Sequence, residues 1–460
     1  MRNTRTRSIV LSLMTLLFLF GIGLFVFRYI TNASSWAFSP VNKHFSREQL
    51  VKAGDIVDCN NVLLAHSENG KRKYNDDENT RRALLHTVGD NTSHIPSSVQ
   101  TLYHDELYGY NFILGVNSPE VLGKSKNIKI TLDSEVCKVA LNALGSHKGA
   151  VCVYNYKTGE IVCMVSTPTY DPYHPEVVEK DSSEKYEGAY INRVLNSSYT
   201  PGSVFKIITS ASGLAYLDDM ENKTYSCHQT ELVNNKKITC LGSHGDINLK
   251  NAMMRSCNIY FADLAIELGN EQMTNTANSM GFNRSFQIDR VKTKKSFYNV
   301  DKADDYNLGW SGIGQYNDLL NPMHSVILMG AVANSGEACT PHFIKDIYLD
   351  KPSSNARYRT LGSKEKLLPK NTADILKGIM RYNVTANYGD SMFPHLNVCA
   401  KTGTAEVGED KEPHGWMIGF SSNDDTPLAF CVIVENSGYG SKTAGPIAEK
   451  VLNYAAKRLK

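Results

Sequence analysis

The sequence predicts an α+β fold that follows an N-terminal membrane-spanning helix. Residues 8–27 carry no charge, and such a helix is long enough to cross a hydrocarbon core of roughly 30 Å. Residues 148–168 form two apolar runs around a turn, and residues 398–436 contain three further strand-like runs. Because helical patterns lie at both ends of these strands and between them, we expect an antiparallel sheet flanked by helices, with a helical subdomain.

The composition is that of a globular protein and does not indicate nucleic-acid binding. The chain has 460 residues, of which 42% are apolar and 21% charged. This length predicts about two or three domains. The net charge of +2 comes from 49 basic and 47 acidic residues, without the concentrated basic face that nucleic acid requires. We therefore expect no nucleic-acid partner.

The apolar N-terminal segment is preceded by Arg2, Arg5 and Arg7. The positive-inside rule then predicts a cytoplasmic tail over residues 1–7, a transmembrane anchor over 8–30, and an extracytoplasmic remainder. A cleaved signal peptide is the alternative, with Ser35-Trp36-Ala37 as a passable cleavage site. Because the apolar region of a signal peptide is normally only about 7–15 residues long, we favour the anchor.

Residues 31–127 are mixed and polar, and we expect them to form a small N-terminal pedestal domain. Residues 54–65 are strand-like, and the charged run over 71–82 predicts a solvated loop. A stronger pattern begins near residue 128, where a strand ends at Asp133, an acidic N-cap for a helix over 134–145.

A Lys-Thr-Gly triplet occurs twice, at Lys157 and at Lys401. The first lies at the tip of the hairpin over 148–168, with Gly159 supplying the turn. Turn chemistry alone explains it, so we assign it no catalytic role. The remaining elements are helices over 200–217, 249–268, 321–336 and 445–459, and strands over 398–407, 415–422 and 428–436.

The chain has ten cysteines. Cys152 and Cys163 lie in apolar strand-like runs and are expected to be buried free thiols. Cys227 and Cys240 flank a polar turn and could close a hairpin as a disulfide. We find no Cys or His pair with zinc-ligand spacing, and we expect neither a metal nor an organic cofactor.

The first chemical motif is Ser203-Val204-Phe205-Lys206, at the start of an apolar helix. Residues three apart on a helix lie on one face, so Lys206 could take the proton of Ser203 if burial keeps the amine neutral. Alone the motif is weak, since Ser182 and Lys185 have the same spacing. An N-cap serine with a surface lysine would look the same.

Two further motifs follow. Ser256-Cys257-Asn258 interrupts a helical pattern and predicts a short loop between two helices, since serine and asparagine compete for backbone groups. There, Ser256 could relay a proton and Asn258 could hold a substrate amide. Thr402 and Thr404 point to one face of a strand, where their hydroxyls could bind a carboxylate. Lys401 adds positive charge, and Gly403 permits close approach of the backbone to a ligand.

With all three motifs in this order after an anchor, the chain resembles the class B penicillin-binding proteins, the membrane-anchored peptidoglycan D,D-transpeptidases. TPGSVFK, HGDINLKNAMMRSCNIYF and AKTGTAEV carry the resemblance, with HGWMIGF and residues 310–336 beside them. GDIVDCNNVLLA resembles the start of the family's N-terminal domain, with Cys59 and Asn61 in place of an Arg and a Gly. The resemblance implies that 128–460 form a penicillin-binding transpeptidase domain with the serine β-lactamase/transpeptidase-like fold.

Carried over to this sequence, the family's catalytic residues are Ser203 as the acylated nucleophile, Lys206 as its base and Ser256 as the proton relay. The substrate-binding residues are Asn258, Lys401, Thr402, Gly403 and Thr404, and the N–H groups of Ser203 and Thr404 form the oxyanion hole. The resemblance implies peptidoglycan stem peptides as substrates and β-lactams as covalent inhibitors. It also implies a membrane-embedded glycan polymerase as a possible partner. The enzyme would serve cell division, sporulation, or the elongation that sets cell shape.

Three alternatives are open at this point. A β-lactamase shares the motifs but needs a water-activating base, and none can be assigned from the sequence. A β-lactam sensor needs cytoplasmic signalling machinery, whereas only residues 1–7 precede the predicted anchor. A catalytically unused scaffold of the cell-wall machinery predicts a broken motif, whereas all three motifs are intact.

Overall fold

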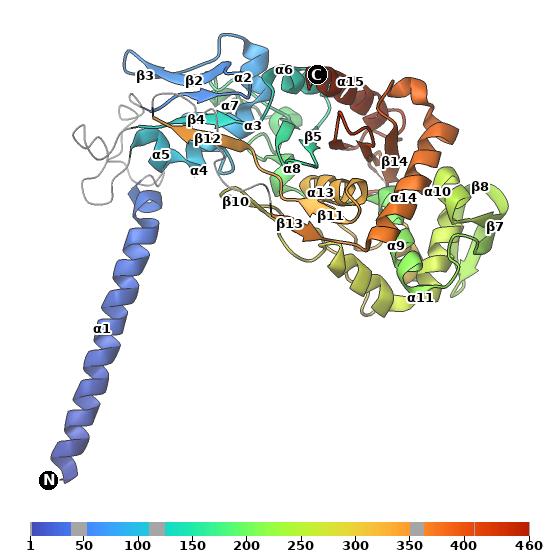
Figure 1. The fold of residues 1–460 in the computed structure, drawn as a ribbon, viewed down its shortest axis with the longest axis horizontal. Coiled ribbons are helices and arrows are strands. Elements are labelled where there is room, and N and C mark those ends of the chain that lie inside the picture. Colours follow the sequence, from blue (N-terminus) through green and yellow to red (C-terminus); the bar gives the residue numbers. More distant parts are fainter. Residues whose placement is uncertain (1, 38–52, 110–124, 350–362, 409, 460) are drawn as a thin grey trace.

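The computed structural model of the chain describes residues 2–37, 53–109, 125–349, 363–408 and 410–459 (Figure 1). The predicted pedestal therefore lies partly outside the described residues. Helix α1 (Arg2–Ala37) extends away from the other elements in Figure 1. Its stretch Thr4–Asn32 is long and apolar enough to cross a membrane and is not buried by the rest of the chain.

A five-stranded antiparallel sheet forms the centre of the larger part of the molecule. Its strand order is β14-β15-β16-β5-β6, which places β14 at one edge. The strands are β14 (Val398–Ala405), β15 (His414–Ser421), β16 (Leu428–Val434), β5 (Gly149–Asn155) and β6 (Ile161–Thr167). Except at the edge, their residues are almost all buried, which explains their continuous apolar runs. The sheet predicted from the sequence is confirmed.

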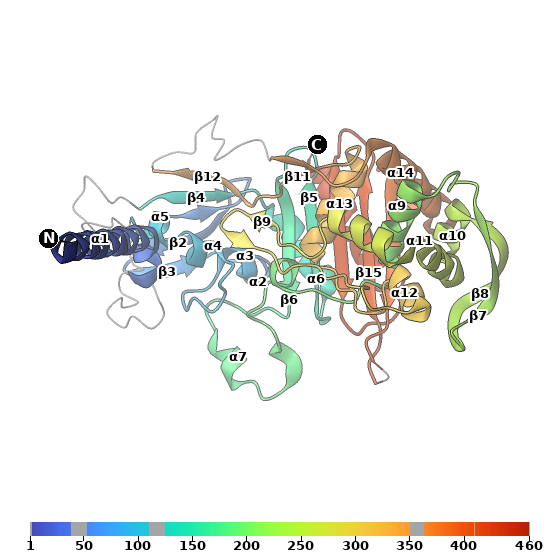
Figure 2. The same cartoon turned by 90° about the horizontal axis from the view of Figure 1, so that it is seen from below.

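Helices cover both faces of this sheet, as Figure 2 shows from below. Helix α13 (Pro322–Ala333) is buried along its whole length against β5, β15 and β16. A Cβ atom at Gly330 would lie only 1.7 Å from the hydroxyl of Tyr154, so glycine lets helix and sheet approach closely. On the other face lie α6 (Ser134–Leu144), capped by Asp133 as predicted, and α15 (Ala444–Arg458).

The helical subdomain lies beside the edge strand β14. It contains η3 (Gly202–Phe205), α9 (Lys206–Tyr216), α10 (Leu249–Arg255), α11 (Asn258–Ser279), α12 (Asp305–Gly312) and α14 (Lys370–Asn383). A long hairpin of β7 (Thr224–Val233) and β8 (Lys236–Asn248) packs against α11. The subdomain brings η3 and the α10–α11 junction to the same edge of the sheet.

A second, mixed sheet has the order β12-β4-β1-β2-β3. Its strands are β12 (Ile344–Tyr348), β4 (Asn127–Ile130), β1 (Ile56–Val57), β2 (Leu63–Glu68) and β3 (Lys71–Tyr74). Strand β12 comes from late in the chain and pairs with β4. The boundary that we predicted at 127/128 lies inside β4, so the division into pedestal and transpeptidase domain stays a proposal.

The charged run over 71–82 is not the solvated loop that we predicted. It forms β3 and helix α2 (Glu78–Ala83). Arg72 is buried and donates hydrogen bonds to Oε1 of Gln100 at 2.8 Å and to the carbonyl oxygen of Gly54 at 2.9 Å. Hydrogen bonds from Nε and Nη1 offset part of the cost of burying this guanidinium, and such pairing is not visible in a count of charges.

The short elements complete the described chain. They are α3 (Leu85–Val88), α4 (Val99–Leu102), α5 (His104–Tyr108), α7 (Glu176–Lys180), η2 (Glu184–Tyr186), α8 (Arg193–Asn196), β9 (Gln287–Ile288), β10 (Val291–Lys292), β11 (Glu337–Cys339), β13 (Lys364–Lys366), η4 (Val384–Tyr388) and η5 (Asp390–Met392).

All ten cysteines are free in the structure. Cys152 and Cys163 are buried, as predicted. Cys227 and Cys240 lie on the two strands of the β7–β8 hairpin, so the predicted hairpin is correct. Their two thiols are not joined, however, and the expected disulfide is not formed here.

Candidate active site

Ser203 lies in the single turn η3, directly before helix α9, and its side chain is partly exposed. The preceding Gly202 has φ +55°, and a Cβ atom there would lie 2.5 Å from the carbonyl oxygen of Thr404. Only glycine fits both the left-handed conformation and this close approach. The turn is thereby held against strand β14, and Ser203 lies beside that strand.

Lys206 begins helix α9 and is fully buried. Its Nζ atom donates hydrogen bonds to the carbonyl oxygen of Ser256 at 2.6 Å, to Oδ1 of Asn258 at 2.8 Å and to Oγ of Ser256 at 3.2 Å. Burial disfavours the charged amine and lowers the pKa of Lys206 to about 7. A substantial neutral fraction at neutral pH is what a base for a serine hydroxyl requires.

Ser256 and Asn258 lie at the junction of α10 and α11, as the predicted loop requires. Ser256 ends α10 in the left-handed conformation, with φ +52°. Cys257 caps α11, because its Sγ accepts a hydrogen bond from the backbone N–H of Tyr260 at 3.4 Å. The side chain of Asn258 bridges Lys206 and the hairpin, since its Nδ2 donates to the carbonyl oxygen of Thr239 at 2.9 Å.

Lys401 reaches the same place from strand β14. Its Nζ donates to Oγ of Ser256 and to the carbonyl oxygen of Thr402, both at 3.0 Å. The side chain is 2% exposed, and burial together with the nearby Lys206 lowers its pKa well below the ordinary value. Two buried ammonium groups this close repel each other, so protonation of one lysine disfavours protonation of the other.

Thr402 and Thr404 lie on the more exposed face of β14, as strand alternation predicts. Thr404 Oγ1 accepts a hydrogen bond from the backbone N–H of Gly440 at 3.3 Å. We expected Gly403 to let the backbone approach a ligand. Its neighbour is instead the protein itself, because a Cβ there would lie 2.8 Å from the carbonyl oxygen of Pro201. Its small size serves the packing of η3 against the strand.

Tyr388 was not found by the sequence argument. Its hydroxyl lies 2.8 Å from Oγ1 of Thr402 and accepts from the backbone N–H of Thr402 at 3.0 Å. Asn383 donates to the same hydroxyl at 3.2 Å and to the carbonyl oxygen of Ala400 at 2.7 Å. Because Tyr388 ends the π-helical turn η4 and belongs to no motif, no sequence signal points to it.

The first Lys-Thr-Gly triplet lies elsewhere. Gly159 has φ +85° at the tip of the β5–β6 hairpin, and Lys157 donates to Oδ1 of Asn334 at 3.0 Å. Its interpretation as a turn is confirmed. The structure thus brings five predicted site residues into one hydrogen-bonded group, which consists of Lys206, Ser256, Asn258, Lys401 and Thr402. Ser203 lies one turn before Lys206, next to Thr404.

Comparison with known proteins identifies the family of the chain. The profile of the penicillin binding protein transpeptidase domain matches residues 149–453. The chain belongs to this family. Its relatives and structural neighbours place it among the class B penicillin-binding proteins, as the resemblance of the motifs implied. The α+β fold with an N-terminal apolar helix agrees with this family as well.

Two curated relatives illustrate the match. The peptidoglycan D,D-transpeptidase PbpA of Mycolicibacterium smegmatis is 27% identical over 351 residues, which cover 71% of this chain and 70% of PbpA. The peptidoglycan D,D-transpeptidase MrdA of Haemophilus influenzae is 26% identical over 376 residues, which cover 73% of this chain and 57% of MrdA.

Solved structures show the same fold. The ceftriaxone acyl-enzyme complex of penicillin-binding protein A from Mycobacterium tuberculosis has a TM-score of 0.77 at 23% identity, covering 89% of this chain and all of that one. The complex of penicillin-binding protein PBP2 with MreC from Helicobacter pylori has a TM-score of 0.73 at 18% identity, covering 88% and 98%.

Proposed function

We propose that this class B penicillin-binding protein is a membrane-anchored D,D-transpeptidase that cross-links peptidoglycan stem peptides through an acyl-enzyme on Ser203. The observation that supports it best is the state of Lys206. This amine is buried one turn after Ser203, has its pKa lowered to about 7, and is held by Ser256 and Asn258. Such an arrangement suits a base that activates a serine nucleophile.

In the acylation step, the Oγ atom of Ser203 bonds to the carbonyl carbon of the penultimate D-Ala while its proton passes to Lys206. The peptide C–N bond breaks, and the departing D-Ala amine takes a proton through Ser256. The N–H groups of Ser203 and Thr404 stabilise the oxyanion. Losing one such donor typically costs about 2.7–4 kcal/mol of transition-state stabilisation.

In the transfer step, the amine of a neighbouring stem peptide attacks the acyl-enzyme. As the new amide bond forms, the attacking amine gives a proton to the Lys206–Ser256 pair. The bond to Ser203 breaks, and the oxygen of Ser203 takes that proton from the pair. A β-lactam acylates Ser203 by the same first step, but the acceptor amine then has no path to the acyl-enzyme. Penicillin-binding protein A from M. tuberculosis forms such acyl-enzymes with ceftriaxone, imipenem and penicillin G.

The position of β14 at the edge of the sheet supports substrate binding next to Thr404, since side chains of α14 and η4 already bond the backbone of Val398, Ala400 and Thr402. An extended stem peptide can lie along such an edge, and the hydroxyls of Thr402 and Thr404 with the ammonium of Lys401 would hold its terminal carboxylate. The groups that contact the two lysines are a hydroxyl, an amide and backbone carbonyls. In the described part of the chain, no carboxylate is hydrogen-bonded to either lysine, whereas a β-lactamase needs a second base that activates water.

The same proposal puts the tail 1–7 in the cytoplasm, residues 8–30 of α1 in the membrane and the transpeptidase domain over 128–460 outside, with the pedestal over 31–127 between them. The basic residues before the apolar stretch support this orientation. A membrane-embedded glycan polymerase that contacts the anchor and the pedestal would supply the strands to be cross-linked.

Labelling with a fluorescent penicillin tests the proposal. The full chain in detergent should form one covalent adduct, located on Ser203 by mass spectrometry, and Ser203→Ala should form none. Ser182→Ala is the matched control, since Ser182 has the same spacing to a lysine but lies in an exposed segment. Labelling that survives Ser203→Ala would refute the assignment. Fast turnover of a chromogenic cephalosporin would instead indicate a β-lactamase.

A further inference from the structure

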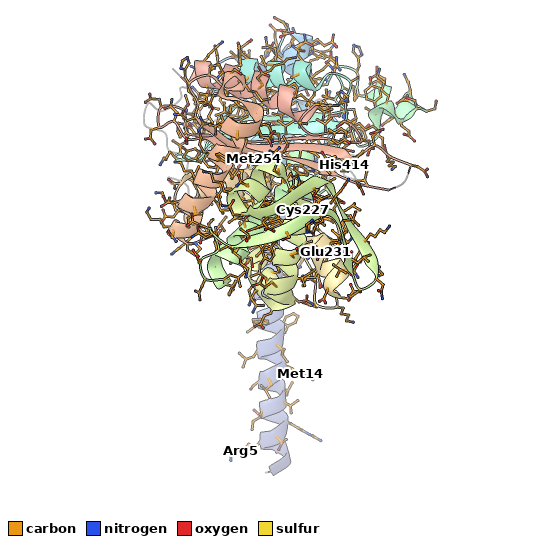
Figure 3. The ribbon with its side chains drawn as sticks, turned by 90° about the vertical axis from the view of Figure 1, so that its right-hand side faces the viewer. Arg5, Met14, Cys227, Glu231, Met254 and His414 are labelled. Atoms are coloured by element: carbon orange, nitrogen blue, oxygen red, sulfur yellow. The ribbon has the colours of Figure 1, made fainter. Side chains whose placement is uncertain are left out.

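Three cysteines and one histidine converge directly behind the Ser256-Cys257-Asn258 loop. They are Cys227 on β7, Cys240 and His244 on β8, and Cys257 at the start of α11. Their ligand atoms all lie within 4.8 Å of one another, and the three cysteines are buried. Figure 3 views the molecule from the side on which the hairpin lies and labels Cys227 on it.

The spacing of these atoms fits a tetrahedral metal ion. A zinc ion with bonds of 2.3 Å to sulfur and about 2.0–2.1 Å to nitrogen separates its ligands by roughly 3.8 Å between sulfurs and 3.5 Å between sulfur and nitrogen. The Sγ atoms of Cys240 and Cys257 are 3.9 Å apart. The Nδ1 atom of His244 lies 3.5 Å from Sγ of Cys227 and 3.7 Å from Sγ of Cys240.

We propose that Cys227, Cys240, His244 and Cys257 bind one Zn²⁺ ion in a closed, structural site. Three thiolates and one imidazole are a soft ligand set that favours zinc over magnesium or calcium. All four tetrahedral positions are filled by protein atoms, so the ion has no position for water and takes no part in the acyl transfer.

This proposal departs from the expectation that the chain needs no metal. The ligands come from two strands and a helix, so the one local pair, Cys240 and His244 on β8, carries only part of the signal. The β7–β8 register is irregular beside the cluster, with one shift between Cys227 and His228 and the next between His228 and Thr230. Bulges of this kind change the direction of side chains in a hairpin.

The site connects the hairpin to the active-site loop. Cys257 stands between Ser256 and Asn258, and Sγ of Cys240 accepts a hydrogen bond from the backbone N–H of Asn258 at 3.3 Å. A metal bound here would fix the positions of Ser256 and Asn258, and hence of the groups that hold Lys206. This positioning role rests on the proposed function, whereas the zinc site itself does not.

Metal analysis of the full chain in detergent, purified with a phosphine reductant, tests the site. We expect about one equivalent of zinc per chain by elemental analysis. After exchange into Co²⁺, the protein should show sulfur-to-metal charge transfer and the intense visible bands of a tetrahedral thiolate site. Zinc below a tenth of an equivalent together with no such cobalt spectrum overturns the proposal.

Variants assign the ligands. His244→Asn and Cys240→Ser should each lower the zinc content severalfold and change the cobalt spectrum. Cys59→Ser, a partly exposed cysteine outside the cluster, should retain the full equivalent. If a ligand variant does not fold, the spectrum of the wild-type cobalt form still decides the question. Full zinc retention by a variant that combines His244→Asn and Cys240→Ser would rule out these ligands.

Acylation kinetics test the positioning role separately. Removal of zinc by a chelator should slow labelling of Ser203 by a fluorescent penicillin roughly tenfold or more, because small displacements of active-site groups are costly, and added Zn²⁺ should restore the rate. Unchanged kinetics in a zinc-free chain would overturn the positioning role but leave the metal site intact. Absence of labelling in both forms would instead contradict the proposed function.

Discussion

Lys206 and Lys401 donate hydrogen bonds to the same oxygen atom, the hydroxyl of Ser256, over 3.2 and 3.0 Å. One lysine comes from the start of α9 and the other from the edge strand β14. Burial lowers the pKa of both amines, and the two charges repel each other. The pair therefore favours a single shared positive charge, with Ser256 as the bridge over which a proton can move.

The first prediction concerns pH. Because the pKa of Lys206 is lowered from 10.5 to about 7, its neutral form predominates above pH 7 and is lost as the pH falls through that value. The second-order rate of acylation by a fluorescent penicillin should rise with pH up to about 7 and then level off, falling roughly tenfold per unit below it.

The matched variant for this prediction is Lys206→Arg, whose guanidinium cannot act as a base at these pH values. It should lose acylation at every pH, while the thermal unfolding of the protein shows whether the fold is kept. A wild-type rate that does not change between about pH 5 and 8 would show that Lys206 is not the group that takes the proton.

A second prediction concerns Tyr388, the residue that sequence reasoning missed. Tyr388→Phe removes the acceptor of the Thr402 N–H and of Asn383 Nδ2. Unpaired buried donors cost about 1–3 kcal/mol, so the free energy of unfolding should fall by about this amount. Acylation should also slow, because Thr402 loses its orientation. Urea unfolding and labelling kinetics measure the two effects.

Tyr382→Phe is the control, because the contact of Tyr382 is between its ring and the ammonium of Lys250, which phenylalanine keeps. It should match the wild type in both measurements. If Tyr388→Phe also matches the wild type, the hydroxyl does not orient Thr402.

The third prediction concerns Gly202, which holds the nucleophile turn against β14. In Gly202→Ala the new Cβ would meet the carbonyl oxygen of Thr404 at 2.5 Å, in a left-handed conformation that costs alanine about 1–2 kcal/mol. The turn must shift, moving Ser203 from the strand, so acylation should slow by tenfold or more. Gly378→Ala serves as comparison, since this helical glycine of α14 has nothing within 4 Å. It should acylate normally and be slightly stabilised.

The sequence predicted the elements of the catalytic sheet well because their signals are local. Asp133 caps α6, and Gly159 makes the hairpin turn, as their neighbours in sequence require. The break at Ser256 was also predictable, since serine and asparagine are poor residues for a helix interior. These local features are enough to place most site residues on the correct elements.

What the sequence did not reveal depends on contacts between distant segments. Strand β12 joins the N-terminal sheet by pairing with β4, and nothing near residue 344 indicates this partner. The burial of Arg72 requires Gln100 and the backbone of Gly54. The contact of Tyr388 with Thr402 likewise exists only after η4 packs against β14. Long-range pairing of this kind leaves no periodic pattern.

Asn61 shows how a departure from the family pattern is accommodated. It has φ +65° at a position where the family's usual N-terminal motif has a glycine. Asparagine is among the few residues that tolerate this left-handed conformation, so the turn before β2 forms without glycine. The strand-like prediction for 54–65 is accordingly confirmed by β1 and β2.

The last prediction concerns Asp58 in the same turn, which connects the second sheet to the start of helix α6. Its fully buried carboxylate accepts hydrogen bonds from the backbone N–H groups of Asn60 and Val62, both at 2.8 Å. It also accepts from Oγ of Ser134 at 2.7 Å, at the start of α6.

Asp58→Ala leaves these donors unpaired and should destabilise the protein by about 1–3 kcal/mol or more. Asp58→Asn keeps one acceptor oxygen and should cost less, whereas the exposed Asp76→Ala should cost little. Thermal unfolding followed by circular dichroism ranks the three variants, and an Asp58→Ala midpoint equal to that of Asp76→Ala would show that this carboxylate does not hold the two parts together.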